Sequence, residues 1–301
     1  MIHVLFLPGS FGSTVYYMVK EFSQEFKHIR EIKPRSKMIA SDGSMHTYRK
    51  TGHWHKGEHL HSFIDVDLNA EITSPVYPMT DYTAEQVISF FSEKFPLDKY
   101  IFLYVDDMKY AEINMLAQYY KIANGAINIS TMSIFCGDNS HNIKKWNPDY
   151  TNWADMKKWE LREWLSIFYP VWVSEWINAR TFIEKSWLAV STRQLLTDPK
   201  TTFKRIIEQY TTFDQTLESE FEDFVNVWRG AQQYLVDEYE LIEKIVDCSI
   251  NKEFLEFKEL NIISEAIIQQ KLRSRGYEIR CYDLDSFPSN TLDMNALLEK
   301  L

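Results

Sequence analysis

VLFLPGSFGSTVYYMVKEF, residues 4–22, is the stretch of this 301-residue chain that decides the fold. Residues 4–7 form a short, continuous apolar run, which is typical of a strand buried on both faces of a parallel sheet. Residues 8–9, Pro-Gly, end it, because proline cannot donate to a ladder and glycine tolerates turn dihedrals. Ser13 or Thr14 can then cap a helix. The apolar side of that helix comprises Val15, Met18, Val19, Phe22 and Phe26.

The turn between this strand and helix has the composition of an anion site. We expect its backbone N–H groups to point outward at a helix N-terminus, where the helix dipole favours an anion and hydroxyls add donors. The residues concerned are Ser10, Phe11, Gly12, Ser13 and Thr14. Glycine and serine also occur in such loops merely to turn the chain, so a purely structural loop stays open. The lysine of a GxxxxGK[ST] motif is missing, which argues against an ATPase or kinase.

Composition narrows the class of protein. Apolar residues make up 45% of the chain and aromatic residues 15%, so a folded core is expected rather than disorder. The net charge of −10 argues against general nucleic-acid binding. The three cysteines are far apart, and no apolar run is long enough to cross a membrane. We therefore expect one domain, residues 1–301, in the reducing environment of the cytoplasm.

Apolar strands alternate with amphipathic helices along much of the chain. The expected strands are YIFLYV at 100–105, 126–135, 187–190 and 277–282, and the expected helices are 83–95, 108–122, 199–210 and 292–301. This alternation predicts an α/β fold with a parallel sheet flanked by helices.

A long helix is expected in a mainly helical elaboration at about 214–275. Apolar residues recur at spacings of four and three from Leu217 to Ile245, interrupted by Glu238, over roughly 30 residues or about 45 Å. The next helix, which carries Ile263 and Ile267, is the expected partner in a helical hairpin. A seam between two copies of the chain, in a homodimer, is the alternative.

Two stretches of this chain resemble the P-loop sulfotransferases, which use the nucleotide sulfate donor PAPS. PGSFGST at 8–14 resembles the 5′-phosphosulfate loop of that family. STRQLLTDPKTTFKRII at 191–207 is similar to its E-x-L-x-x-D-P-x-x-T-hydrophobic pattern. The resemblance implies transfer of a sulfuryl group from PAPS, leaving PAP, to a hydroxyl on a small molecule or carbohydrate. It also implies that residues 9–14, starting with Gly9, cradle the donor.

The chain departs from the family pattern at the phosphate sites. A basic residue usually follows the loop proline, whereas this chain has Gly9. The resemblance also implies a 3′-phosphate site with an arginine just after the middle strand and a serine eight residues later. Those positions hold Asp106, which would repel a phosphate unless neutralised, and Asn114, which can donate a hydrogen bond. Lys109 or Arg275 can substitute for the arginine, or can be purely structural.

The resemblance implies a histidine or glutamate base, and His59, His61 and Asp81 are the available candidates. The histidines also suggest another chemistry, because His53–His61 contains four imidazoles and a carboxylate that could bind Zn²⁺. The simplest alternative is a solvated polar loop. Three hypotheses follow: a sulfotransferase-like enzyme, a catalytically degenerate relative used for binding or assembly, and a metal-dependent hydrolase.

Overall fold

The computed structural model describes residues 1–6, 10–30, 71–73, 84–123, 177–183, 185–253, 255, 260 and 262–277. The expected strand at 126–135 and the expected helix at 292–301 lie outside these residues. The expected strand at 277–282 does so too, apart from Tyr277.

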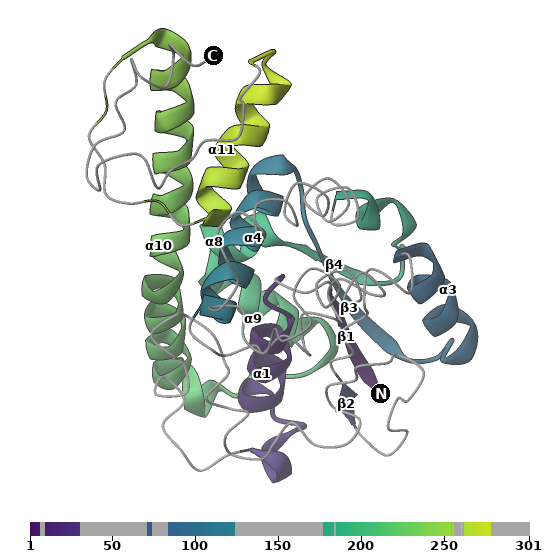
Figure 1. Ribbon diagram of the computed structural model, residues 1–301. Helices are drawn as coiled ribbons and strands as arrows, with labels where there is room; N and C mark the ends of the chain where they lie inside the picture. Colours follow the sequence, from purple (N-terminus) through teal and green to yellow (C-terminus); the bar gives the residue numbers. More distant parts are fainter. Residues whose placement is uncertain are drawn as a thin grey trace, which may run out of the picture.

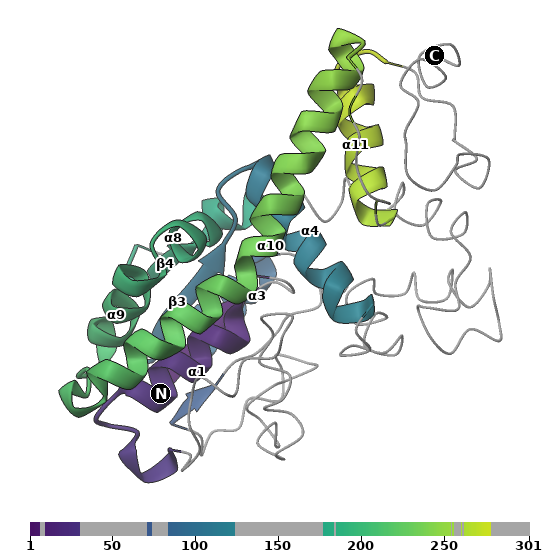
Figure 2. The same cartoon turned by 90° about the vertical axis from the view of Figure 1, so that its left-hand side faces the viewer.

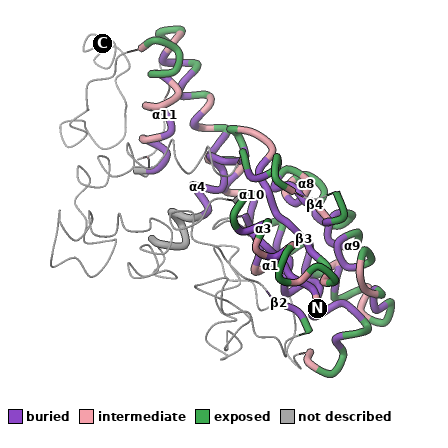
Figure 3. Tube along the Cα trace, turned by 90° about the vertical axis from the view of Figure 1, so that its right-hand side faces the viewer, coloured by how far each residue is buried: buried purple, intermediate pink, exposed green. Residues whose placement is uncertain are grey.

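The described strands form one all-parallel sheet, which confirms the α/β prediction. They are β1 (Ile2–Phe6), β2 (Ile72–Thr73), β3 (Lys99–Tyr104) and β4 (Leu188–Ser191), in the order β2-β1-β3-β4. Val4 lies opposite Ile101, and Ile101 lies opposite Leu188. All five residues of β1 are buried, as the continuous apolar run predicts. Figure 3 shows the central strands purple, and so buried, along nearly their whole length.

Helices cover both faces of this sheet. The helices α1 (Gly12–Phe22), α9 (Pro199–Tyr210) and α10 (Glu218–Asn251) lie on one side of it, and α3 (Ala84–Lys94) lies on the other (Figures 1 and 2). The remaining helical segments are α4 (Met108–Ala123), α8 (Thr192–Thr197), α11 (Ile262–Ser274), η1 (Lys27–Ile29), η5 (Ala179–Phe182) and η6 (Gln215–Leu217). Two of them, α4 and α11, pack against α10.

Capping residues explain where α8 and α9 begin. The Ser191 hydroxyl accepts a hydrogen bond from the Gln194 N–H, and the Gln194 side chain accepts one from the Ser191 N–H, which is a complete capping box. Asp198 then accepts from the Thr201 N–H, and Pro199 occupies the first position of α9. The 191–207 stretch therefore starts at the last residue of β4 and forms two helices, α8 and most of α9; the helix that begins at Pro199 is as its sequence predicts, and α8 is an additional element.

The long helix and its expected partner, the helix that carries Ile263 and Ile267, are confirmed, but the expected hairpin is wrong. Ser264 donates to Glu238, and Lys271 and Arg275 then pair with residues successively further along α10, Glu243 and Asp247. The contacts advance along both helices together, so α11 runs parallel to α10. A connection of ten residues, 252–261, can span about 33 Å when extended, which is enough to return beside α10 before α11 begins.

A buried histidine joins three strands at the amino end of the sheet. The imidazole of His3 lies 2.7 Å from the Thr73 hydroxyl and 2.9 Å from the Asp98 carboxylate. Its ring also stacks on Tyr100 at 5.2 Å. Burial lowers the pKa of His3, and the Asp98 carboxylate offsets this only in part, so the neutral ring is favoured.

Across the described residues, none of the helices combines the length and apolar character that a membrane crossing requires.

Candidate functional site

The strand order places a topological switch point between β1 and β3. The chain leaves β1 toward β2 on one side and later returns to β3 on the other side. In open parallel sheets, ligands bind in the crevice outside the carboxyl ends of the two strands that flank such a point. The residues that follow β1 and β3 begin the helices α1 and α4. The predicted anion loop and Asp106 are therefore at the same edge of the sheet.

The first turn of α1 is built around Phe11. This residue has φ 63°, in the left-handed region, and its carbonyl accepts from the Thr14 N–H at 3.0 Å and the Val15 N–H at 3.1 Å. The ring is buried and meets Trp228 of α10 edge to face, with ring centroids 5.5 Å apart. Of the five amides expected to face outward, that of Thr14 is thus used within the turn.

Close packing surrounds the rest of this loop. A Cβ at Gly12 would lie 2.0 Å from the ring of Phe6, so glycine is required there. Ser10 and Thr14 are buried, and Ser13 is partly exposed. A left-handed residue followed by a helical one turns successive N–H groups toward one side, which is the geometry of an anion nest. Within residues 10–14, Ser13 is the one position that is partly exposed.

Trp228 adds a buried donor beside the loop. Its side chain is completely buried, and its indole N–H has no hydrogen-bond partner among the residues that the structure describes. Phe203 of α9 packs against the same indole at 5.2 Å. A buried donor without a partner loses its hydration, at about 1–3 kcal/mol.

A charged cluster lies where β3 and β4 end. Arg193, the second residue of α8, donates a hydrogen bond to the Asp107 carboxylate, and its Nε is 3.8 Å from Oδ2 of Asp106. The guanidinium lies over the ring of Tyr110, 5.2 Å from its centroid. Asp107 also accepts from the Tyr110 N–H at 3.3 Å and so caps α4. Burial raises the pKa of the Tyr110 phenol, and Arg193 beside it offsets this only in part.

Asn114 lies one helical turn after Tyr110 on α4. Its side chain is completely buried, and neither the amide nitrogen nor the amide oxygen has a hydrogen-bond partner in the described part of the chain. The predicted phosphate-binding residue therefore keeps both a donor and an acceptor available. Such a group is expensive to bury without a partner.

The two other cations considered from the sequence lie elsewhere. Arg275 pairs with Asp247 at 3.2 Å near the end of α11, away from the sheet edge that holds β1 and β3 (Figure 1). The ammonium of Lys109 lies over the rings of Tyr110 and Tyr239, 5.9 and 5.6 Å from their centroids. Arg275 is therefore not brought to the end of β3, and Lys109, three residues after Asp106, is engaged with aromatic rings.

Several predicted site residues lie outside the described residues. They are Gly9, His59, His61, Asp81 and the His53–His61 run as a whole. Within the ranges that the structure does describe, no three histidine, cysteine, aspartate or glutamate side chains are grouped to hold a metal ion. The hydrolase hypothesis therefore stays a prediction.

Sequence reasoning missed Arg193 and Trp228. Arg193 stands inside the 191–207 stretch, which predicts only scaffold, and Trp228 is one member of the apolar seam. The signal available for Arg193 is its place three residues after the predicted strand at 187–190, because carboxyl ends of parallel strands share one edge.

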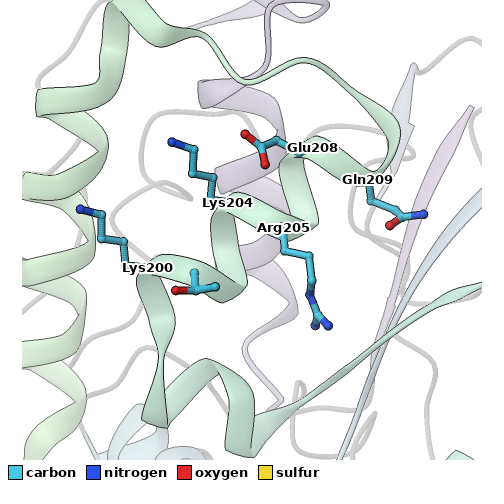
Figure 4. Close-up of a pocket in the computed structure, with 6 residues that line it drawn as sticks. Lys200, Lys204, Arg205, Glu208 and Gln209 are labelled. Carbon is cyan, nitrogen blue, oxygen red and sulfur yellow. The ribbon is translucent and has the colours of Figure 1, made fainter.

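A surface depression of about 390 Å³ lies along α9, outside the switch point. Figure 4 shows the side chains that line it projecting from one side of this helix. Two of its cations have carboxylate partners on α10, since Lys200 pairs with Glu222 and Lys204 with Glu218, and the third, Arg205, donates to the Gln194 side chain. This depression is therefore a solvated ion-pair surface.

No family model, no curated protein and no solved structure matches this chain.

Proposed function

We propose that this protein is a sulfotransferase-like enzyme that binds PAPS at the turn between β1 and α1 and sulfates a hydroxyl acceptor. The observation that carries the proposal is the position of the two stretches that resemble this family. One forms the turn into α1 and the other forms β4, α8 and α9, on either side of β3 in one parallel sheet. Both meet the carboxyl edge, where the strand order predicts a ligand.

The proposed chemistry requires positioning more than covalent help. The acceptor oxygen bonds to sulfur as the sulfur–oxygen bond to the donor phosphate breaks, and a base takes the hydroxyl proton. In our proposal the amides of Gly12 and Ser13, at the positive end of α1, hold the phosphosulfate. Asn114, with its unpartnered buried amide, holds the second phosphate of the nucleotide. The base is proposed to be one of His59, His61 and Asp81.

A second candidate is a catalytically degenerate relative that keeps the scaffold for binding or assembly. It is favoured by Phe11, whose ring anchors the loop against Trp228 rather than leaving it open. It is also favoured by Asp106 and Asp107, which put two carboxylates where a phosphate is expected. In this hypothesis the turn into α1 is structural.

A thermal-shift series with PAP separates the two candidates. A ligand that binds only the folded state stabilises it by about 4 kcal/mol at a thousand times its Kd. We expect PAP to raise the Tm. Adenosine, which lacks both the 3′- and the 5′-phosphate, should leave the Tm unchanged. A flat response at millimolar PAP would reject the enzyme proposal and favour the degenerate relative.

The site itself is tested by Ser13→Asp. An aspartate in the first turn of a helix favours folding, so the Tm without ligand should be maintained. Its charge should repel the phosphosulfate group and abolish the PAP response. Ser219→Asp makes the same change in the first turn of α10, at an exposed position, and should leave the PAP response intact.

A further inference from the structure

The carboxyl end of β3 presents a charge problem for any phosphate ligand. Asp106 and Asp107 stand there side by side, and Oδ2 of Asp106 is buried with no hydrogen-bond partner within the described ranges. A doubly or more highly charged phosphate is repelled by such a pair unless a cation stands between them. The local sequence after β3 supplies Lys109, but its ammonium is directed to two aromatic rings.

The cation that meets both carboxylates comes from the neighbouring strand. Arg193 follows β4 and enters α8, and it contacts Asp107 by a hydrogen bond and Asp106 at 3.8 Å. Its side chain is still 50% exposed, and Tyr110 supports one face of the guanidinium. A guanidinium carries five N–H donors in a planar fork, so an edge that holds a carboxylate leaves donors for a second anion.

We propose that Arg193 is the phosphate-binding cation of this site, and that Asp106 and Asp107 hold it at the rim and compete with the ligand for it. The inference rests on the proposed function, and it assigns Arg193 to the phosphate on the nucleotide 3′ position, which lies toward Asn114 and α4. Arginine suits this role because its fork matches phosphate geometry. Without ligand, the cluster of Asp106, Asp107 and Arg193 carries one more negative than positive charge. The two carboxylates therefore determine the affinity of Arg193 for the phosphate.

This competition predicts that removing the charge of Asp107 strengthens the binding of PAP. If Arg193 only ties α8 to α4, Arg193→Gln affects stability and not PAP affinity, and neutralising Asp107 does no more than remove its own repulsive charge. If Arg193 binds phosphate, neutralising Asp107 releases the guanidinium and removes a repulsive charge, so binding tightens. Asp107→Asn suits the test because asparagine caps a helix about as well as aspartate, which preserves the start of α4.

The experiment is calorimetric titration of the full chain with PAP and with AMP, which lacks the 3′-phosphate. For PAP we expect Arg193→Gln to weaken binding at least tenfold and Asp107→Asn to tighten it severalfold. For AMP both substitutions should have less than a twofold effect. Arg273→Gln, the same change at an exposed position on α11, should bind PAP like the wild type.

The outcomes separate the two levels of inference. No binding of PAP by the wild type would overturn the proposed function, and the assignment of Arg193 with it. Binding by the wild type that Arg193→Gln leaves unchanged would overturn the assignment alone. Equal losses for PAP and AMP would also overturn it, because the effect would not follow the 3′-phosphate. If Arg193→Gln fails to fold, Arg193→Lys keeps the charge without the fork and should bind PAP more weakly than the wild type.

Discussion

The two halves of α10 are held to the protein in different ways. The first half packs by aromatic rings: Phe221 and Phe224 contact Phe22 of α1, and Trp228 contacts Phe11 and Phe203. The second half also buries apolar side chains, among them Leu235, Ile242 and Ile245, and adds a cluster of charged groups to them. There Lys271 of α11 lies 2.7 Å from Glu112 of α4, 2.6 Å from Glu243 and 3.0 Å from the Tyr239 hydroxyl.

The difference follows from what each half covers. The first half lies over α1 and α9 beside the sheet, where apolar surface is buried on both sides. The second half extends past the sheet and packs against α4 and α11 (Figure 2). We call the group of Glu112, Tyr239, Glu243 and Lys271 the clasp. Apolar contacts carry little direction, whereas an ion triad favours one partner and one register, so we expect the clasp to help fix how α11 lies.

Removing the central aromatic ring should have the largest effect. We expect Trp228→Ala to lower the free energy of unfolding by about 3–5 kcal/mol, since a completely buried indole leaves a cavity among rings that cannot close it. Val227→Ala, at the neighbouring exposed position, should change it by less than about 0.5 kcal/mol. Urea unfolding followed by circular dichroism measures both. Equal effects would show that the first half is not held by its buried rings.

Breaking the clasp should lower the free energy of unfolding by less than Trp228→Ala does. Its effect should be concentrated in α11. Lys271→Met leaves the Glu112 carboxylate buried without its counter-ion, and we expect a loss of about 3 kcal/mol. The double variant with Glu112→Gln should recover at least about 1 kcal/mol of it, because the two sites are coupled. Hydrogen exchange should increase in α11 before it increases in the first half of α10. Lys244→Met, at an exposed position, is the matched control.

The stability that the clasp contributes should be lost at both low and high pH. Burial opposes ionisation of Glu243, but the hydrogen bonds from Lys271 and Tyr239 outweigh it and lower the pKa of that carboxyl below 4.5. Burial likewise opposes the charge on Lys271, and the two carboxylates outweigh it and raise its pKa above 10.5. The stability difference between the wild type and Lys271→Met should therefore be constant between these values. It should shrink as the pH falls below 4.5 or rises above 10.5, and a difference independent of pH would contradict the ion triad.

Between pH 7 and 5, the titration of His3 should dominate the pH dependence of the free energy of unfolding. The folded protein favours neutral His3, with a pKa below 6.5, whereas the unfolded chain binds a proton there near pH 6.5. Stability should thus fall as the pH drops through this range, by at most about 1.4 kcal/mol per pH unit for one proton. His3→Gln should flatten that slope whatever its effect at pH 7, and an unchanged slope would assign the titration to another group.

The smallest effect is expected from the ion pair between α9 and the first half of α10. Lys200 and Glu222 are both about half exposed, so water screens their attraction. We expect Lys200→Ala to leave the urea midpoint unchanged within error. A loss comparable to that of Lys271→Met would mean that surface charge also holds the first half of α10.

Local patterns predicted the elements whose signal lies within one segment. β3 has an uninterrupted apolar run, and the seam from Leu217 to Ile245 has helical spacing, so both were found from the sequence. Even Glu238, the exception in that seam, has a structural reason, since it accepts a hydrogen bond from Ser264. The direction of α11 could not be predicted this way, because it depends on ion pairs between distant residues.

The candidate site divides in the same manner. The turn of Ser10–Thr14 could be proposed from its local composition, and Asn114 from the family resemblance. The inward turn of Phe11, the unpartnered indole of Trp228 and the contact of Arg193 with Asp106 and Asp107 could not. The contact of Phe11 with Trp228 and that of Arg193 with the two aspartates each join residues more than 80 positions apart in the chain.

The amino-acid sequence by itself determined that this chain builds a parallel α/β sheet and a long helix, because burial on two faces and helical periodicity are written in consecutive residues. The tertiary structure alone decided that Arg193 meets both carboxylates after β3 and that Lys271 of α11 pairs with Glu112 and Glu243. The physical reason is that an ion pair is defined by a distance in space. Nothing in either local sequence records that distance.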